Sequence, residues 1–186
     1  MLARGETAAT FQLNGSGMTR FLKDLKPTNI DDINAMVALY RPGPLAFIPD
    51  YIERKHNPHK VKYLDPRFEE YLAPTFGILI YQDDIMLIAV NFAGYSWGDA
   101  DKFRKAMGKK IPEIMAEQKE KFSKGCMEVG NLTEKQTTDL WEMIETFAAY
   151  GFNKAHAASY GRIAYLTSYL KAHYPCLLYT SDAADD

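Results

Sequence analysis

The stretch Gly94-Tyr-Ser-Trp-Gly-Asp-Ala-Asp-Lys-Phe-Arg-Lys-Ala-Met-Gly-Lys-Lys110 decides how the fold of this sequence is interpreted. A glycine-bearing turn leads into a segment that we expect to be helical from about Asp99, with Phe103 and Met107 on one side. Its second half, from Lys102 to Lys110, carries five basic residues and no acidic one. The sequence therefore predicts an amphipathic, basic helix in this stretch.

The basic residues of this helix are candidates for binding phosphate. Arg104 and Lys105 are adjacent, and Lys109 and Lys110 follow about one turn later. Phosphate needs closely placed, charged donors, and arginine can bind it in a forked, bidentate way. Two other interpretations stay open: a solvated charged face, and an ion pair that Asp101 forms with Arg104 and Lys105 on one helix face.

Helical patterns continue downstream of this helix, which Gly108 can end. Pro112 suits the first turn of a helix that runs to about Val129. A capping box at Thr133–Gln136 begins another, which ends near Ala149. A last long helix is expected from about Lys154 until just before Pro175.

Upstream, the pattern is again mostly helical. A helix is expected from about Gln82 to Phe92, and another begins after a cap at Thr28 or Asn29 and ends at the Arg41-Pro-Gly-Pro44 run. Residues 45–76 mix short helices with proline-marked turns, and residues 77–80 could form one short strand. The opening, from Gly5 to Met18, is typical of a short strand or loop. The predicted fold class is therefore mainly α.

A second candidate site is Ala149-Tyr-Gly-Phe-Asn-Lys-Ala-His-Ala-Ala-Ser-Tyr-Gly161. Gly151 permits a tight turn, after which polar residues gather at the start of the last helix, where exposed N–H groups attract phosphate. Tyr160 offers a flat face on which a base could stack. An ordinary capped turn with closely packed small residues is the alternative. The candidate residues are Asn153, Lys154, His156, Ser159 and Tyr160.

Two further motifs carry weaker signals. Tyr81-Gln-Asp-Asp84 is similar to the metal-binding turn of reverse transcriptases, which requires a hairpin between two strands. Here a helical pattern follows, so we expect Asp83 and Asp84 to be carboxylates of a first helical turn. Arg41 follows a helix and could face either solvent or a pocket.

Composition narrows the class of protein. The 186 residues are 47% hydrophobic and 25% charged, and the net charge of −2 argues against a chain that is all nucleic-acid surface. The two cysteines have no metal-ligand spacing, and no leader or long apolar run is evident, so a cytoplasmic protein with reduced thiols is expected. Fingerprints of a hydrolase triad, a phosphate loop or a dinucleotide fold are absent, which disfavours a self-sufficient hydrolase or dehydrogenase.

Six segments, taken in order, resemble one family, the alpha subunit of bacterial DNA polymerase III, and mainly its nucleotide-binding fingers. The resemblance spans nearly everything except the last residues, and six collinear motifs are far more specific than one. The segments are Phe11-Gln-Leu13, Ala38-Leu-Tyr-Arg-Pro-Gly-Pro-Leu45, Gly77-Ile-Leu-Ile-Tyr-Gln82, Arg104-Lys-Ala-Met-Gly-Lys-Lys110, Gly151-Phe-Asn-Lys-Ala-His-Ala-Ala-Ser-Tyr160 and Leu170-Lys-Ala-His-Tyr-Pro175.

The resemblance implies a domain organisation. Residues 1–44 would be the connecting segment between palm and fingers together with the first helix, and residues 45–175 an incomplete helical fingers domain. Residues 176–186 look like a translated sequencing-adapter scar, for which a frayed natural C-terminus is the alternative.

The resemblance also implies a function, the positioning of an incoming dNTP and its triphosphate during template-directed DNA synthesis. Many relatives carry two arginines where this chain has Arg104 and Lys105, so one bidentate fork is lost and Lys105 is the weaker candidate. Implied partners are primer-template DNA, the sliding clamp, the clamp loader and proofreading subunits. The residues implied to bind the nucleotide are Arg104, Lys105, Lys109, Lys110, Asn153, Lys154, His156, Ser159 and Tyr160, with Arg41 as a further possibility.

Two competing interpretations come from other classes. A non-catalytic helical module could use the basic helix to bind nucleic acid or a partner protein, but it leaves the order of the six motifs unexplained. A small reverse-transcriptase-like palm built on residues 81–84 lacks strands on both sides.

The first prediction concerns activity. In the resembled family, Mg²⁺ is bound by three palm aspartates that this chain does not contain, so the cofactor of the full-length enzyme is not bound by residues of this fragment. The purified chain should therefore show no magnesium-dependent primer extension in a gel assay with labelled primer-template. Detectable extension that EDTA abolishes would contradict the assignment.

Overall fold

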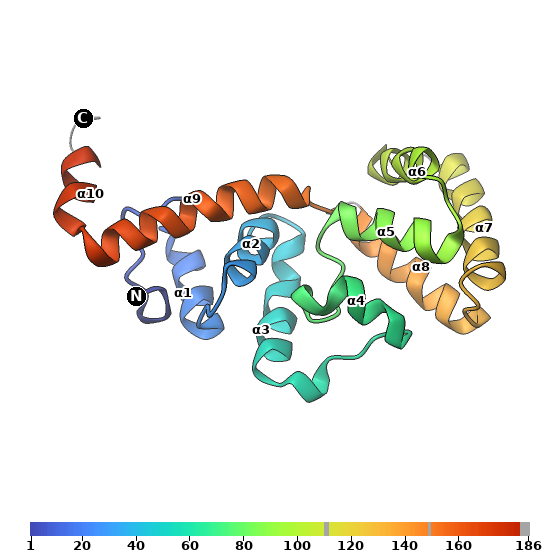
Figure 1. Cartoon of the computed structure of the whole chain (residues 1–186), viewed down its shortest axis with the longest axis horizontal. Coiled ribbons are helices and arrows are strands. Elements are labelled where there is room, and N and C mark those ends of the chain that lie inside the picture. Colours follow the sequence, from blue (N-terminus) through green and yellow to red (C-terminus); the bar gives the residue numbers. More distant parts are fainter. Residues whose placement is uncertain (110–111, 149, 183–186) are drawn as a thin grey trace. The chain divides into compact units, whose positions relative to one another are not determined.

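The computed structural model of the chain describes residues 1–109, 112–148 and 150–182, and the predicted site residue Lys110 lies outside them. The chain is mainly α, as predicted. Short 3-10 turns connect several of the helices (Figure 1). The helices are α1 (Ser16–Leu25), α2 (Ile30–Leu39), α3 (Ile48–His56), α4 (Glu69–Leu72), α5 (Gln82–Ala93), α6 (Trp97–Lys109), α7 (Pro112–Glu128), α8 (Glu134–Ala148), α9 (Lys154–His173) and α10 (Pro175–Asp182).

The strand segments considered from the sequence are not present in the described residues. The opening consists of a 3-10 turn at Leu2–Arg4 followed by further turns, and α1 begins at Ser16. Residues 78–80 are irregular, and the extended backbone there amounts to one isolated parallel bridge between Tyr81 and Phe152. A strand needs a neighbour along its length to satisfy its N–H and C=O groups, and neither segment has one.

Helix boundaries follow the predicted signals closely in the second half of the chain. α7 begins at Pro112, and α8 follows a capping box in which Thr133 and Gln136 bond reciprocally. Gly108 does not end α6, because it is still helical and the described helix extends to Lys109. α10 occupies much of the predicted non-native tail, whose residues 183–186 lie outside the described chain.

The chain forms two compact units. Unit 1 comprises residues 1–56 together with the chain from Ala155 onward, and unit 2 comprises Asn57–Lys154. In unit 1, α9 packs closely on α2 at Gly161, where an added Cβ would lie 1.9 Å from Oδ1 of Asn34. Further along α9, the hydroxyl of Thr167 accepts a hydrogen bond from the backbone N–H of Phe11 at 3.0 Å.

Unit 2 is a packed group of helices in which α5 contacts α6 and α7, and α7 contacts α8 (Figure 1). Its core is an aromatic cluster from four elements of the chain: Tyr95, Phe103, Phe122 and Trp141 are all buried. Phe103 and Phe122 stack with centroids 5.4 Å apart, and Trp141 lies 5.8 Å from Phe122. Burial of such rings contributes strongly to stability, so this cluster fixes the position of the basic helix α6.

Gly125 marks the closest helix contact in unit 2. A Cβ added to this residue of α7 would lie 2.1 Å from the backbone oxygen of Ala93, at the end of α5. Because backbone cannot move aside like a flexible side chain, Gly125→Ala should destabilise the chain by about 1–3 kcal/mol. Chemical unfolding followed by circular dichroism measures this.

The matched control for that substitution is Gly98→Ala in α6, where an added Cβ would have its nearest neighbour, Ser96 Oγ, at 3.8 Å. In a helix with room for a methyl group, alanine is favoured over glycine by roughly 0.5–1 kcal/mol. Equal stability of the Gly125→Ala chain and the parent chain would contradict the packing.

A buried ionic network holds the start of α2. Asn29 is the N-cap and forms a capping box with Asp32, whose carboxylate also receives a hydrogen bond from the backbone N–H of Thr28 and an ion pair from Lys55. The side chains of Asp32 and Lys55 are 1% and 9% exposed. Burial alone would raise the pKa of Asp32, but Lys55 and the backbone donors outweigh it and hold the pKa below its usual value.

This lowered pKa makes stability depend on pH. The ionised carboxylate stabilises the folded chain above the pKa of the unfolded state, about 3.9, and the stabilisation is lost as the pH falls through the lower folded value. Asp32→Asn should cost about 1–3 kcal/mol at neutral pH and much less near pH 2. Urea unfolding at both pH values tests this, with the exposed neighbour Asp31→Asn as control. The same loss at both pH values would contradict it.

Candidate functional site

The predicted basic site on α6 contains the ion pair that the sequence left open. Both oxygens of Asp101 are engaged: Oδ1 accepts from Nε and Nη2 of Arg104 at 3.1 and 2.8 Å, and Oδ2 lies 2.7 Å from Nζ of Lys105. These hydrogen bonds to Lys105 and Arg104 lower the pKa of Asp101. Lys109, at the end of the described helix, is exposed.

Arg104 also connects α6 to α5. Its Nη1 donates to Oε1 of Gln82, the first residue of α5, at 3.3 Å. The side chain of Arg104 is 34% exposed. Its guanidinium is therefore held between two helices while part of it still faces solvent.

The segment that carries the second motif lies along the start of α5. The backbone N–H of Phe152 donates to the carbonyl of Ile80 at 3.2 Å, and the N–H of Gln82 donates to the carbonyl of Phe152 at 3.0 Å. A Cβ on Gly151 would lie 2.8 Å from Cγ of Gln82. The described contact therefore explains the glycine by close approach to Gln82, where the sequence suggested only a tight turn.

Lys154, the first residue of α9, is held at both ends. Its backbone N–H donates to Oδ2 of Asp83 at 2.8 Å, and its Nζ donates to Oδ1 of Asp84 at 3.1 Å. The ammonium also lies 5.4 Å from the centre of the Tyr81 ring. The expectation that Asp83 and Asp84 belong to a first helical turn is confirmed, because α5 begins at Gln82. The sequence did not predict that Lys154 would be the partner of these two aspartates.

Two predicted cations therefore reach the start of one helix from distant parts of the chain. Arg104 lies 22 residues from Gln82, and Lys154 lies 70 residues from Asp84. Burial raises the pKa of Asp84, with a smaller opposing effect from Lys154. We call this group the α5 start cluster. Its charged members are Arg104, Lys105 and Lys154 with the carboxylates of Asp83, Asp84 and Asp101.

The remaining predicted residues of the second motif lie in both units of the chain. Asn153 is an exposed residue of unit 2, whereas His156, Ser159 and Tyr160 belong to unit 1. The ring of Tyr160 lies 4.2 Å from that of His156 and 5.3 Å from that of Phe11. The hydroxyl of Ser159 donates to the carbonyl of Ala155 at 2.8 Å, a bond within the helix.

Arg41 is also in unit 1, and it is half-buried. Its Nε donates to the carbonyl of Ala38 at 3.0 Å, near the end of α2. Burial lowers the pKa of its guanidinium. The side chain therefore helps to close the last turn of a helix, and its part in a nucleotide site stays a prediction.

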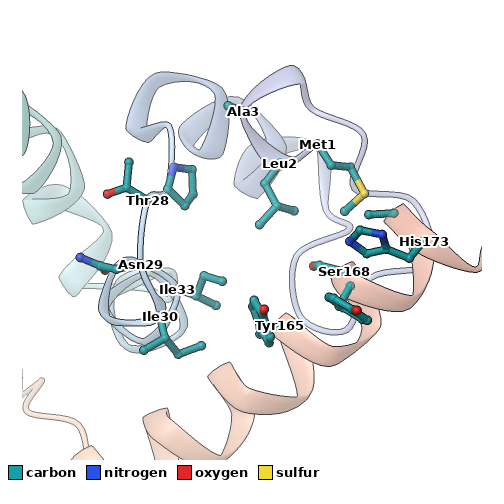
Figure 2. A pocket seen from close by; sticks show the side chains of 13 residues that line it. Met1, Leu2, Ala3, Thr28, Asn29, Ile30, Ile33, Tyr165, Ser168 and His173 are labelled. Carbon is teal, nitrogen blue, oxygen red and sulfur yellow. The ribbon is translucent and has the colours of Figure 1, made fainter.

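Unit 1 contains a pocket of about 380 Å³. Figure 2 shows Tyr165, Ser168 and His173 of α9 on one side, with Ile30 and Ile33 of α2 across from them. None of the residues predicted from the sequence to bind nucleotide lines it. The pocket and the predicted nucleotide site therefore share no residue.

The resemblance to a polymerase implies Mg²⁺, which proteins bind mainly through carboxylate oxygens. Across residues 1–109, 112–148 and 150–182, no three His, Cys, Asp or Glu side chains come together in a way that could hold an ion. Asp83 and Asp84 are engaged by Lys154, so they do not fit that role. In the same part of the chain, no helix has the length and apolar character needed to cross a membrane.

Comparison with known proteins identifies the class. Residues 1–130 match the family model described as the bacterial DNA polymerase III alpha subunit finger domain. The chain therefore belongs to the DNA polymerase III alpha subunit family.

Individual relatives agree along nearly the whole chain. The DNA polymerase III subunit alpha of Thermus aquaticus is 49% identical over 180 residues, which is 94% of this chain and 15% of that protein. Its counterpart in Treponema pallidum is 46% identical over 175 residues, or 94% of this chain and 15% of the relative. That of Xylella fastidiosa strain Temecula1 is 42% identical over 186 residues, or 100% and 16%. The chain thus spans about one sixth of the length of these relatives.

Proposed function

We propose that this chain, as part of a DNA polymerase III alpha subunit, positions an incoming dNTP through its triphosphate. The observation that supports this most is the convergence of Arg104 and Lys154 on the start of α5, within a chain of the finger-domain family. The cations come from two separate motifs, and no local pattern required both to contact the first turn of the same helix.

Arg104 is the strongest candidate contact. A guanidinium has five N–H donors, and the bonds to Asp101 and Gln82 use three of them. The other two can bind a phosphate oxygen while Asp101 keeps the side chain in place. Such preorganised positive charge stabilises the charge that develops on phosphoryl oxygens when a primer 3′-hydroxyl attacks the α-phosphate and pyrophosphate leaves.

The remaining predicted residues are proposed with different roles. Lys105 and Lys109 would add positive charge beside Arg104, and Lys154 would contact the phosphates from the other side of the cluster. Tyr160 would stack on a base, although its ring already contacts Phe11 and His156. The other residues included in the proposal are Arg41, Lys110, Asn153, His156 and Ser159.

The complete subunit is proposed to act on primer-template DNA and dNTPs with Mg²⁺. Magnesium would neutralise phosphate charge and activate the attacking oxygen when bound. We assign it no ligand in the described part of this chain, so its ligands would have to come from elsewhere in the polymerase.

The proposal predicts a kinetic effect of Arg104→Ala. The test enzyme is the full-length Thermus aquaticus relative in which this chain replaces the matching segment. Loss of a charged hydrogen bond should weaken transition-state stabilisation by about 1–3 kcal/mol, which lowers kcat/KM for dNTP roughly 5- to 150-fold. Steady-state primer extension measures this.

The control is Lys119→Ala, which removes an exposed cation of α7 and should leave the kinetics unchanged. Unaltered kcat/KM in Arg104→Ala would remove Arg104 from the site. A different outcome would favour the helical binding module instead. In that case the parent chain would bind DNA in a salt-sensitive way, and added dNTP would not affect the binding.

A further inference from the structure

Asp84 is an unusual component of the α5 start cluster. Its side chain is 1% exposed, and its Oδ2 is a buried oxygen for which the described structure offers no hydrogen-bond donor. Its Oδ1 accepts from Nζ of Lys154, whose side chain is 45% exposed. A buried carboxylate is thus joined to an ammonium that reaches toward solvent.

Stability alone is a poor explanation for this pair. Removing a carboxylate from water is costly, and a single partner that is itself half-solvated repays that cost incompletely. The raised pKa of Asp84 reflects the same imbalance. Its place in the first turn of α5 reduces the cost, because helix N-termini favour negative charge. What the pair does achieve is a fixed direction for the Lys154 side chain.

The neighbouring contacts restrain the same residue. Asp83 holds the backbone N–H of Lys154 at 2.8 Å, and the Tyr81 ring lies 5.4 Å from its ammonium. A lysine side chain loses rotamer entropy when it is immobilised. Because Lys154 is already restrained in the free protein, little of this entropy remains to be lost when a phosphate binds.

We propose that Asp83 and Asp84 are positioning residues that hold Lys154 where it meets the triphosphate, Asp83 through the backbone and Asp84 through the ammonium. This inference rests on the proposed nucleotide-binding function. The two carboxylates act through Lys154 and do not touch the nucleotide or a metal. Asp84 thereby gains a role that its place in a Tyr-x-Asp-Asp sequence does not suggest.

The test is a double-mutant cycle in the chimeric full-length polymerase, with primer extension at varied dNTP concentration. Asp84→Asn keeps the shape of the side chain and should raise KM for dNTP about tenfold with a smaller change in kcat. In a Lys154→Met background, Asp84→Asn should have little further effect on KM, because its effect passes through the ammonium.

Each outcome decides the inference. If Asp84→Asn impairs both backgrounds equally, its role is structural and the proposal is wrong. If Lys154→Met raises KM and Asp84→Asn does not, the positioning role fails while the proposed function survives. If Lys154→Met itself leaves KM unchanged, Lys154 is not a nucleotide contact and both assignments fail.

Further variants guard against a chain that merely unfolds. Asp83→Ala removes the acceptor for the Lys154 N–H together with a negative charge beside Asp84, and it should raise KM about threefold. Asp83→Asn removes the same charge but retains an acceptor, so it should recover most of the loss. Glu145→Gln, on an exposed position of α8, is the control for carboxylate removal. Thermal melting of each 186-residue variant, followed by circular dichroism, identifies any that do not fold. If Asp84→Asn fails to fold, unchanged KM in Asp83→Ala overturns the inference.

Discussion

The pairing of the segment 151–154 with the start of α5 is the constraint on which the candidate site depends. Two backbone hydrogen bonds join Phe152 to Ile80 and Gln82, and two carboxylates then hold Lys154. Backbone bonds are directional, so this pairing fixes the register between two segments that are far apart in the sequence. Because Gln82 also receives Arg104, the same few residues set the position of both cations.

The formal charges of the α5 start cluster are balanced, which suits the proposed binding of an anion there. Unpaired cations packed together would repel one another, and this repulsion would destabilise the folded chain. Asp101 pairs with both Arg104 and Lys105, which allows these two cations to lie side by side, and Asp84 pairs with the ammonium of Lys154. A triphosphate would then meet donors already in place, which is how a protein avoids reorganisation during a reaction.

Local signals made much of the fold predictable. Pro112, the capping box at Thr133 and Gln136, and the apolar spacing after Gln82 gave helices close to those observed, since each signal acts within one or two turns. α1 was missed because its glycine-punctuated start, at Gly15 and Gly17, suggested a loop. For the site, the sequence supplied the cations and Asp101, but the partnership of Lys154 with Asp84 spans 70 residues and has no local signal.

The geometry also separates Arg104 from Lys105 as phosphate contacts. Arg104 is 34% exposed and held by two side chains from different helices, whereas Lys105 is 61% exposed and is held, among the residues that the structure describes, by Asp101. A guanidinium fixed on two sides presents its remaining N–H groups in one direction, and an exposed ammonium acts mainly as a mobile point charge. If the two residues bind phosphate as proposed, Lys105 would mainly add positive charge, and directional recognition would fall to Arg104, on the helix α6 that packs against α5.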